Sequence, residues 1–223
     1  MTVNDVYSIC LYAVGKNLNQ GYLSPSDFNV IINQGQRSYV SYLLGTFQQY
    51  VPGRPIARVE LGQNSVVRDR LSPVIYGYIL NIDSSGFSAY PGDYVQTDAM
   101  WSMYGFQRIR YADQHNFVSM YNSVIDPIVT NPIYELEYSG FRFFPNSLVQ
   151  SRLHYVKDPP DMVWGYVEDS NGVPVYSAAH STQPVWDDLS LYEIIVRGLQ
   201  IVGVNLNSAM VYQYSQEIKN LGQ

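Results

Sequence analysis

The sequence predicts an α+β fold in which the N- and C-terminal segments form an antiparallel helical bundle and the middle of the chain forms a β-rich insertion. Both ends repeat apolar residues at helical spacing behind capping motifs. The middle instead has short β-branched and aromatic runs bounded by Pro, Gly and Asn. We place the helical bundle at residues 1–50 and 187–223 and the insertion at residues 51–186. A chain of 223 residues is long enough to bury a full core.

The first two helices are predicted from capping boxes, in which a hydroxyl residue is followed three residues later by an acidic one. Thr2 with Asp5 predicts a helix through residue 14, and Ser24 with Asp27 predicts a longer one. Pro25 suits the first helical position of the longer helix, which we expect to run back antiparallel to about residue 49. Its predicted apolar face consists of Phe28, Ile31, Ile32, Gly35, Tyr39 and Leu43.

The other face of this longer helix is polar but almost uncharged. It carries Asn29, Asn33, Gln34, Arg37 and Ser41. A solvated helix face is usually rich in charge, so this composition predicts that the face meets a protein neighbour.

The middle of the chain changes to strand-like runs. They lie at residues 56–61, 74–82, 106–111, 133–138, 141–144 and 148–156. Asp83–Gly86 and Asp169–Gly172 resemble fragments of calcium loops but lack the distal glutamate of such a site, so we interpret them as hairpin turns. Residues 112–124 are expected to form a short surface helix.

The helical period returns near the C-terminus. Ser190 with Glu193 predicts a third capping box, directly after Trp186, and Gly203 is the expected end of that helix. Its buried stripe is predicted to be Leu191, Ile194, Ile195, Gly198 and Val202. A last helix from about residue 208 aligns four apolar residues, namely Val211, Tyr214, Ile218 and Leu221.

The composition favours a subunit of an assembly. Charged residues make up only 14% of the chain, against roughly 25% in typical soluble domains. The chain has 21 tyrosines, which combine apolar area with a hydrogen-bonding tip and suit surfaces that become buried on assembly. The alternative interpretation is an ordinary Tyr-rich β-domain.

The charge pattern argues against tight, sequence-specific binding of DNA. The net charge is −6, and the basic residues include only two close pairs, Arg68 with Arg70 and Arg108 with Arg110. Neither pair forms the clustered basic stripe that binding to phosphates requires. A wall past which DNA slides without sticking remains compatible with this charge.

The sequence predicts no enzyme activity, cofactor or metal site. His115, His154 and His180 are the candidate general bases, but no serine lies in a nucleophile elbow. Metal-binding motifs are missing, and Cys10 lies on the apolar stripe of the first helix, which predicts a buried, inert thiol. The alternative of a glycosidase or sugar-binding module would use Trp101, Tyr104, Trp164 and Trp186 as a stacking platform.

No targeting signal is evident, because the N-terminal residues have no basic region and no long apolar run. No segment has the roughly 18 apolar residues of a membrane span. With Cys10 as the single cysteine, no intrachain disulfide can form, and we expect folding in the cytosol.

Three segments carry a resemblance to a known group of proteins. They are GKNLNQGYLSPSDFNVIINQGQRSY, NPIYELEYSGFRFFPNSLVQSRLHYVKDPP and YSAAHSTQPVWDDLSLYEIIVRGLQIVGVNL. In these segments the chain resembles the small neck proteins, of ring or head–tail adaptor type, of short-tailed bacteriophages, notably the crAss-like group and related marine phages. The similarity spans nearly the full chain, and the stretch 53–90 matches least.

The resemblance implies a structural protein of the virion neck, assembled in the host cytoplasm. Such proteins form a ring, usually of twelve copies, that docks beneath the portal and continues the DNA exit channel. The implied partners are further copies of the chain, the portal, the next tail or ring protein, and genomic DNA passing through without sequence-specific binding. We expect contacts between subunits at Tyr90, Tyr94, Trp101 and Tyr104. We expect contact with the portal or a neighbour at Val211, Tyr214, Ile218 and Leu221. The alternatives are another tail component or the sugar-binding module above.

Overall fold

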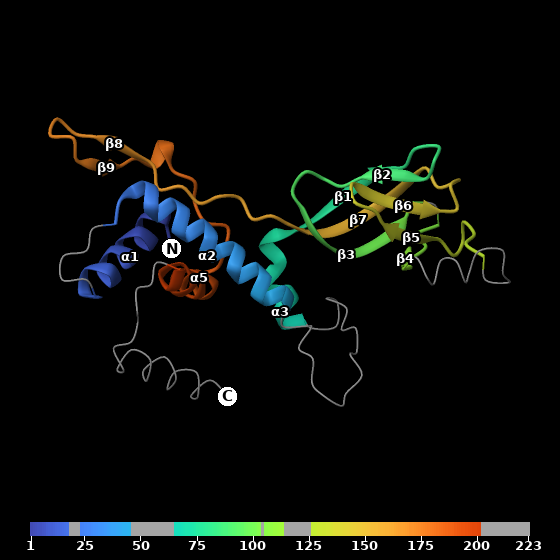
Figure 1. Ribbon diagram of the computed structural model, residues 1–223, viewed down its shortest axis with the longest axis horizontal. Coiled ribbons are helices and arrows are strands. Elements are labelled where there is room, and N and C mark those ends of the chain that lie inside the picture. The colour runs from blue at the N-terminus through green and yellow to red at the C-terminus, as the bar shows by residue number, and fades with distance from the viewer. Residues whose placement is uncertain (18–22, 46–64, 104, 114–125, 202–223) are drawn as a thin grey trace, which may run out of the picture. The chain divides into compact units, whose positions relative to one another are not determined.

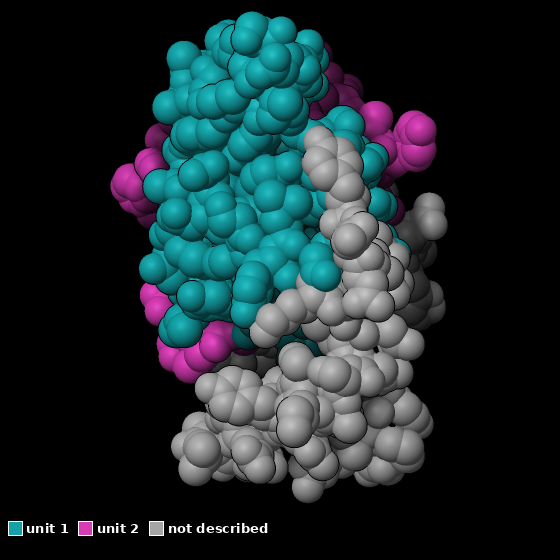
Figure 2. Space-filling model, turned by 90° about the vertical axis from the view of Figure 1, so that its left-hand side faces the viewer, with its two compact units in different colours: residues 1–56, 159–223 teal, residues 57–158 magenta. Residues whose placement is uncertain are grey.

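The computed structural model describes residues 1–17, 23–45, 65–103, 105–113 and 126–201. The chain divides into two compact units, which we describe separately (Figures 1 and 2). Unit 1 comprises residues 1–56 and 159–223, and unit 2 comprises residues 57–158.

Three α-helices form the helical part of unit 1: α1 (Val3–Asn17), α2 (Pro25–Gly45) and α5 (Asp188–Ile201). The first two predicted caps are confirmed. The Asp5 amide donates to Thr2 Oγ1 (3.2 Å), and the Asp27 amide donates to Ser24 Oγ (3.1 Å). The acidic side chains add negative charge at the positive end of each helix dipole.

The third predicted cap is wrong. Helix α5 begins at Asp188, and the side chain of Asp187 caps it by accepting bonds from the amides of Leu189 (3.2 Å) and Ser190 (3.3 Å). Asp and Ser are both good N-caps, so the spacing in the sequence could not separate the two registers. Ser190 is instead buried, and its hydroxyl forms a hydrogen bond with that of Tyr39 at 3.0 Å.

Helices α2 and α5 pack closely at two glycines. A Cβ atom on Gly35 would lie 2.7 Å from the carbonyl oxygen of Ile194 and 2.9 Å from the backbone nitrogen of Gly198. No side chain fits there, so the backbones touch and the apolar stripes of both helices interlock. The predicted stripes are buried in their described part, except that Ile31 is half-buried and Val202 lies outside the described residues.

The polar face of α2 meets a neighbour from its own chain. Asn33 binds both backbone groups of Met162: its Oδ1 accepts from the amide (2.8 Å), and its Nδ2 donates to the carbonyl (2.9 Å). Asn29 does the same for Trp164 (2.7 and 3.4 Å), and Gln36 donates to the carbonyl of Pro160 (3.0 Å). We call these contacts the amide ladder. Four helical residues rise about 6 Å and two extended residues about 6.6 Å, so a helix face can match alternate residues of an extended segment.

Unit 1 also contains a small antiparallel sheet. Strands β8 (Tyr166–Glu168) and β9 (Pro174–Tyr176) pair through the predicted turn, where Gly172 has φ +75°. A 3₁₀ turn, η4 (Ala178–His180), follows. Trp164, which is buried, contacts Tyr166 and Tyr176 of this hairpin and Tyr7 of α1.

Unit 2 consists of two sheets preceded by α3 (Ser65–Leu71) and the 3₁₀ turn η3 (Ser72–Val74). The first sheet has the order β1-β7-β3, with β1 at Ile75–Asn81, β7 at Gln150–Lys157 and β3 at Tyr94–Ser102. The second has the order β2-β6-β5-β4, with β2 at Phe87–Ala89, β6 at Gly140–Phe144, β5 at Ile133–Leu136 and β4 at Arg110–Tyr111. Within the sheets all pairs are antiparallel except β4 with β5.

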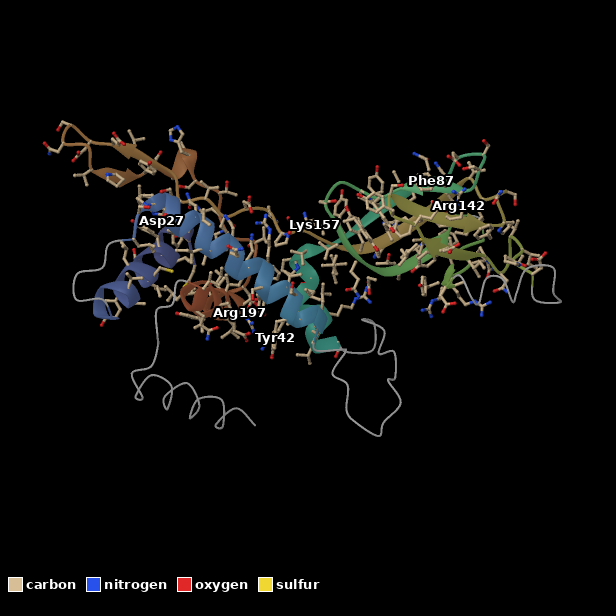
Figure 3. The ribbon with its side chains drawn as sticks, in the orientation of Figure 1. Asp27, Tyr42, Phe87, Arg142, Lys157 and Arg197 are labelled. Carbon is tan, nitrogen blue, oxygen red and sulfur yellow. The ribbon has the colours of Figure 1, made fainter. Side chains whose placement is uncertain are left out.

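The inner faces of the two sheets enclose an aromatic core. Phe141 and Phe143 of β6 are fully buried and meet Leu153 and Tyr155 of β7 in one cluster. The predicted turn Asp83–Gly86 is confirmed: Asp83 Oδ1 accepts from the amides of Ser85 and Phe87, and Gly86 has φ +82°. Beside it, the guanidinium of Arg142 lies 5.7 Å from the ring centre of Phe87 (Figure 3).

The predicted architecture, a helical bundle carrying a middle β insertion, is wrong beyond its mixed α+β class. The described residues form four α-helices and nine strands in three sheets, a more β-rich fold than predicted. One sheet, β8-β9, belongs to unit 1, which contains α1, α2 and α5. The physical reason is the amide ladder, which ties the extended residues 160–164 to α2. The predicted fourth bundle helix, from residue 208, and residues 114–124 of the predicted surface helix lie outside the described residues.

Candidate functional site: exposed apolar surfaces and a buried ionic cluster

The first set of predicted contact residues lies mainly in unit 2. Tyr90 and Tyr94 stack with ring centres 4.6 Å apart, and both meet the ring of Phe141 edge-on. Their hydroxyls bond within the unit, Tyr90 to the carbonyl of Glu137 and Tyr94 with Thr97. Both rings are partly buried, so they support the core edge, and their contact with a second subunit stays a prediction.

Trp101 lies on the outer face of the β1-β7-β3 sheet, with its ring 4.6 Å from that of His154. Tyr104 lies outside the described residues. So do Val211, Tyr214, Ile218 and Leu221, the second predicted set.

Beside Trp101 lies a buried ionic cluster that sequence reasoning missed. The side chain of Asp98 is 1% exposed; its Oδ2 accepts from Arg68 at 2.7 Å, and its Oδ1 has no partner. Nε2 of His154 is also buried without a partner, 3.0 Å from where a Cβ on Gly77 would lie. Burial raises the pKa of Asp98 despite Arg68, and burial lowers the pKa of His154, with Arg152 adding to the effect.

The position of Asp98 has a structural origin. The pairing of β3 with β7 shifts register between Thr97 and Ala99, so Asp98 occupies a bulge. A bulge changes the direction of a side chain, and the side chain of Asp98 at this bulge is buried beside Arg68. Alternation alone could not reveal this, because a bulge breaks the two-residue period on which strand predictions rest.

The described residues do not assemble a catalytic constellation around these groups. His180 is exposed and bonds Ser177 through Nδ1 at 2.9 Å, while His115 lies outside the described residues. Cys10 is 1% exposed, so its predicted burial is confirmed, and burial raises its pKa to about 12. Among the described residues, no three His, Cys, Asp or Glu side chains gather as metal ligands would.

Exposed apolar side chains gather at one end of unit 2, opposite the end where β1 begins and β7 ends. We call this the tip; its exposed members are Met103, Phe106, Ile128 and Val149. Backbone bonds tie its loops together, from the amide of Met103 to Gln150 (3.3 Å) and from that of Ile82 to Val149 (2.9 Å). The tip contains a hollow of about 650 Å³ lined by Ser102, Met103, Val129, Thr130, Ser147, Leu148, Val149 and Gln150.

Phe106 is the most unusual residue of the tip. Its φ is +50°, directly after Gly105 at +68°, and its side chain is 76% exposed. A bulky residue with positive φ is strained by about 1–2 kcal/mol. Because this aromatic side chain is exposed, burial within the chain does not offset the strain of its backbone, which points to a role in contact with another molecule.

A second exposed apolar stripe runs along α5, on the side away from its buried residues. Leu189 (72% exposed), Tyr192 and Val196 follow one another at spacings of three and four, so they lie on one helix face. Asp187, Asp188 and Glu193 accompany them. On another side of α5, the Arg197 guanidinium lies 4.2 Å from the ring centre of Tyr42 of α2 (Figure 3).

Sequence reasoning missed both surfaces. The α5 stripe was visible as a second apolar spacing in LSLYEIIV, and the dipeptide Gly105-Phe106 marked a turn with an aromatic at its apex. The sequence analysis predicted no role for the first signal and placed Phe106 at the start of a strand-like run, residues 106–111.

Comparison with known proteins adds no assignment: no family model and no curated protein matches the chain. No helix in the described part of the chain is long and apolar enough to span a membrane.

Proposed function

We propose that this protein is a structural subunit of a virion neck: a ring protein that joins the portal to the tail of a short-tailed bacteriophage and continues the DNA exit channel. The observation that supports this most is the pair of exposed apolar surfaces, the tip of unit 2 and the α5 stripe. Apolar patches of this kind on a soluble chain usually mark contacts with other proteins. The resemblance in three sequence segments supplies the particular assembly.

The chemistry of the described residues fits a joint better than a catalyst. Within the described residues, no three His, Cys, Asp or Glu side chains gather as the ligands of a metal would. A net charge of −6 suits a wall along which DNA passes without being held. The protein would then act by position alone, in the neck of a virion assembled in the host cytoplasm.

A sugar-binding function has less support. Trp164 and Trp186 are 4% and 5% exposed. Each indole nitrogen has a partner inside unit 1, Asn4 for Trp164 and Gln36 for Trp186. Rings enclosed in this way present no flat face on which a sugar could stack.

The test is the mass of the purified chain by light scattering, alone and mixed with the portal protein of the same genome. A complex of fixed stoichiometry supports the proposal, whatever the mass of the free chain. A lasting monomer that does not bind the portal would contradict it and favour a more distal tail component.

A truncated chain ending at residue 207 tests the predicted portal contact separately. If the apolar residues from Val211 to Leu221 bind a groove on the portal, truncation abolishes the complex while the free chain stays folded. Unchanged portal binding would remove that contact from the proposal.

A further inference from the structure

We infer that strand β1 of unit 2 binds an extended acidic peptide segment of another protein, which adds to the β1-β7-β3 sheet as a further strand. The segment pairs with the outer edge of β1, by which we mean the edge that faces away from β7. The inference goes beyond the proposed function, because this contact uses neither the tip nor the α5 stripe. In strand addition of this kind, main-chain hydrogen bonds give affinity and side chains give specificity.

Strand β1 is an edge strand without the usual protection against pairing. It pairs with β7 along its full length without a register shift, and no described strand pairs with its outer edge (Figure 1). Edge strands are normally protected by charged residues, proline, bulges or short length. The seven residues of β1 include no charged residue and no proline. The opposite edge strand, β3, has two register shifts and contains Asp98. Of these two edges, β1 is therefore the one at which a further strand can add.

The backbone groups of the outer edge can be assigned from the pairing with β7. The amide of Ile82, directly after β1, donates to the carbonyl of Val149 at 2.9 Å. Hydrogen-bonded pairs recur at every second residue of an antiparallel ladder, so the register directs the even-numbered residues of β1 toward β7. The N–H and C=O groups of Gly77 and Ile79 consequently point away from β7, and no described residue bonds to them. An added strand would satisfy these groups.

Arg152 of β7 gives this edge a preference for an acidic residue. Its Nη2 lies 3.6 Å from where a Cβ on Gly77 would lie, so the missing side chain of Gly77 lets the guanidinium lie over β1. Arg152 is exposed and forms no hydrogen bond or ion pair with a described residue. An added strand runs about 4.8 Å from β1, which is within reach of a glutamate side chain. A carboxylate opposite Gly77 can therefore bind the guanidinium of Arg152.

The charges of the neighbouring strands favour the same occupant. Strands β1 and β7 together contain Arg152 and Lys157 and no Asp or Glu, and Lys157 lies beside the exposed ring of Tyr76 (Figure 3). Acidic residues on the segments around the sheet have partners elsewhere, as is the case for Asp83, Asp93 and Asp98. A second copy of β1 is disfavoured, because pairing at Gly77 would supply no carboxylate and would bring two Arg152 guanidiniums together.

The side chains of β1 determine the rest of the segment. Tyr76 and Tyr78 are about half exposed on one face of the strand, and Ile79 is 45% exposed on the other. β-branched residues pack well beside aromatic and aliphatic side chains of a neighbouring strand. The segment that fits is therefore an alternation of Thr and Val with a Glu opposite Gly77.

The experiment titrates the full, ¹⁵N-labelled chain with the end-blocked peptide TVTETVT and, as control, with TVTKTVT. The Glu peptide should bind at least about fivefold more tightly than the Lys peptide. Amide exchange gives the signature of strand addition. The amides of Gly77 and Ile79 should exchange fast in the chain alone and become protected in the complex, whereas that of Tyr78 is protected in both. No binding at millimolar peptide, or binding that leaves these two amides unprotected, would overturn the inference.

Two charge substitutions test the role of Arg152. Arg152→Glu should reverse the preference, so that the Lys peptide binds more tightly. Ile79→Glu places a carboxylate directly opposite Arg152 and should weaken binding of the Glu peptide about tenfold. Val95→Glu is the matched control, because Val95 is 42% exposed on the other edge strand, and it should bind the Glu peptide as wild type does. An unchanged preference in Arg152→Glu would contradict the acidic partner.

The remaining outcomes separate this inference from the neck proposal. A chain that dimerises without peptide and protects the amides of Gly77 and Ile79 would show that a second copy occupies the edge, and would overturn the inference. A chain that binds the portal but neither peptide would also overturn it and leave the neck proposal standing. Binding of the Glu peptide without a portal complex would support the inference and contradict the neck proposal.

Discussion

The two units of this protein hold their backbones in place by different means. In unit 1 the extended residues 160–164 are fixed by side-chain amides of α2, and Asn33 alone binds both backbone groups of Met162. In unit 2 the strands pair with one another, and their inner faces meet around Phe141 and Phe143. The extended segment of unit 1 is therefore fixed by a few directional bonds, whereas the two sheets of unit 2 are held together by the contact area between them.

The two units should therefore be sensitive to different kinds of substitution. Apolar burial is spread over many contacts, but it leaves a cavity when a large ring is lost. When a side-chain amide that binds a buried N–H and C=O is removed, water cannot reach these groups to replace the lost hydrogen bonds, and each group stays without a partner.

The largest effect is expected from Phe141→Ala in unit 2. Phe141 is fully buried and contacts the rings of Tyr90, Tyr94 and Tyr134. Removing a buried Phe ring typically costs about 3–5 kcal/mol of unfolding free energy. Urea denaturation measures the loss, and ¹⁹F NMR of fluorotryptophan-labelled chain locates it, because Trp101 reports on unit 2 and Trp164 and Trp186 on unit 1.

Tyr138→Ala is the control for this ring deletion, because Tyr138 is fully exposed and lies between β5 and β6. It should change stability by less than about 0.5 kcal/mol. A Phe141→Ala chain as stable as Tyr138→Ala would show that the two sheets do not depend on their shared core.

The next effect is expected in unit 1, from Asn33→Ala. The substitution leaves the buried amide and carbonyl of Met162 without partners, at a cost of about 1–3 kcal/mol. In ¹⁹F NMR the signals of Trp164 and Trp186 should shift, while that of Trp101 stays in place. Gln34→Ala, exposed on the same helix, is the matched control and should be nearly neutral. Equal stabilities of the two variants would mean that the amide ladder contributes nothing.

The sequence predicted those features of the fold that depend on neighbouring residues. The capping boxes of α1 and α2, the apolar stripes of α2 and α5 and the two hairpin turns all follow from spacings of two to four residues. The amide ladder could not be predicted, because it joins residues 124 to 135 positions apart and its residue types also suit a solvated or intermolecular face. A helix face of Asn and Gln indicated a protein contact but not which protein.

The candidate surfaces were less predictable than the fold. Exposure depends on what packs over a residue, and the sequence does not show that Leu189 faces outward while Leu191 is buried. To predict the exposure of Phe106, one would have to know that its φ is positive. To predict the burial of Asp98, one would have to know that it occupies a bulge. Both arise from local departures from regular geometry, which periodicity cannot report.

A smaller effect is expected from Asp187→Ala at the start of α5. The variant removes the side-chain acceptor for the amides of Leu189 and Ser190, and loss of an N-cap usually costs about 1 kcal/mol. The hydrogen bond of the Ser190 hydroxyl, followed by those of the two amides, lowers the pKa of Asp187. Its stabilisation is therefore complete above pH 3.8 and is lost as the pH falls through the lower folded-state pKa. Asp187→Ser should retain the cap without the charge. Full loss of stability in both variants would mean that the charge, and not the cap, matters.

The smallest effect is expected from Asp98→Asn in unit 2, because burial and the attraction of Arg68 act on this carboxyl in opposite directions. Burial raises the pKa of this carboxyl, and the attraction of Arg68 offsets part of the rise. The folded state therefore holds the proton more tightly than the unfolded state does, and wild-type stability falls as the pH rises above 3.8 through the folded-state pKa. The amide that Asp98→Asn introduces cannot ionise, so the variant should gain on wild type between acid and neutral pH. The measurement is the difference in unfolding free energy between the two chains across that range. A difference that stays constant with pH, or that changes in the opposite direction, would show that Arg68 compensates the buried charge in full. The ionic cluster, like the amide ladder, would then be held by its directional bonds.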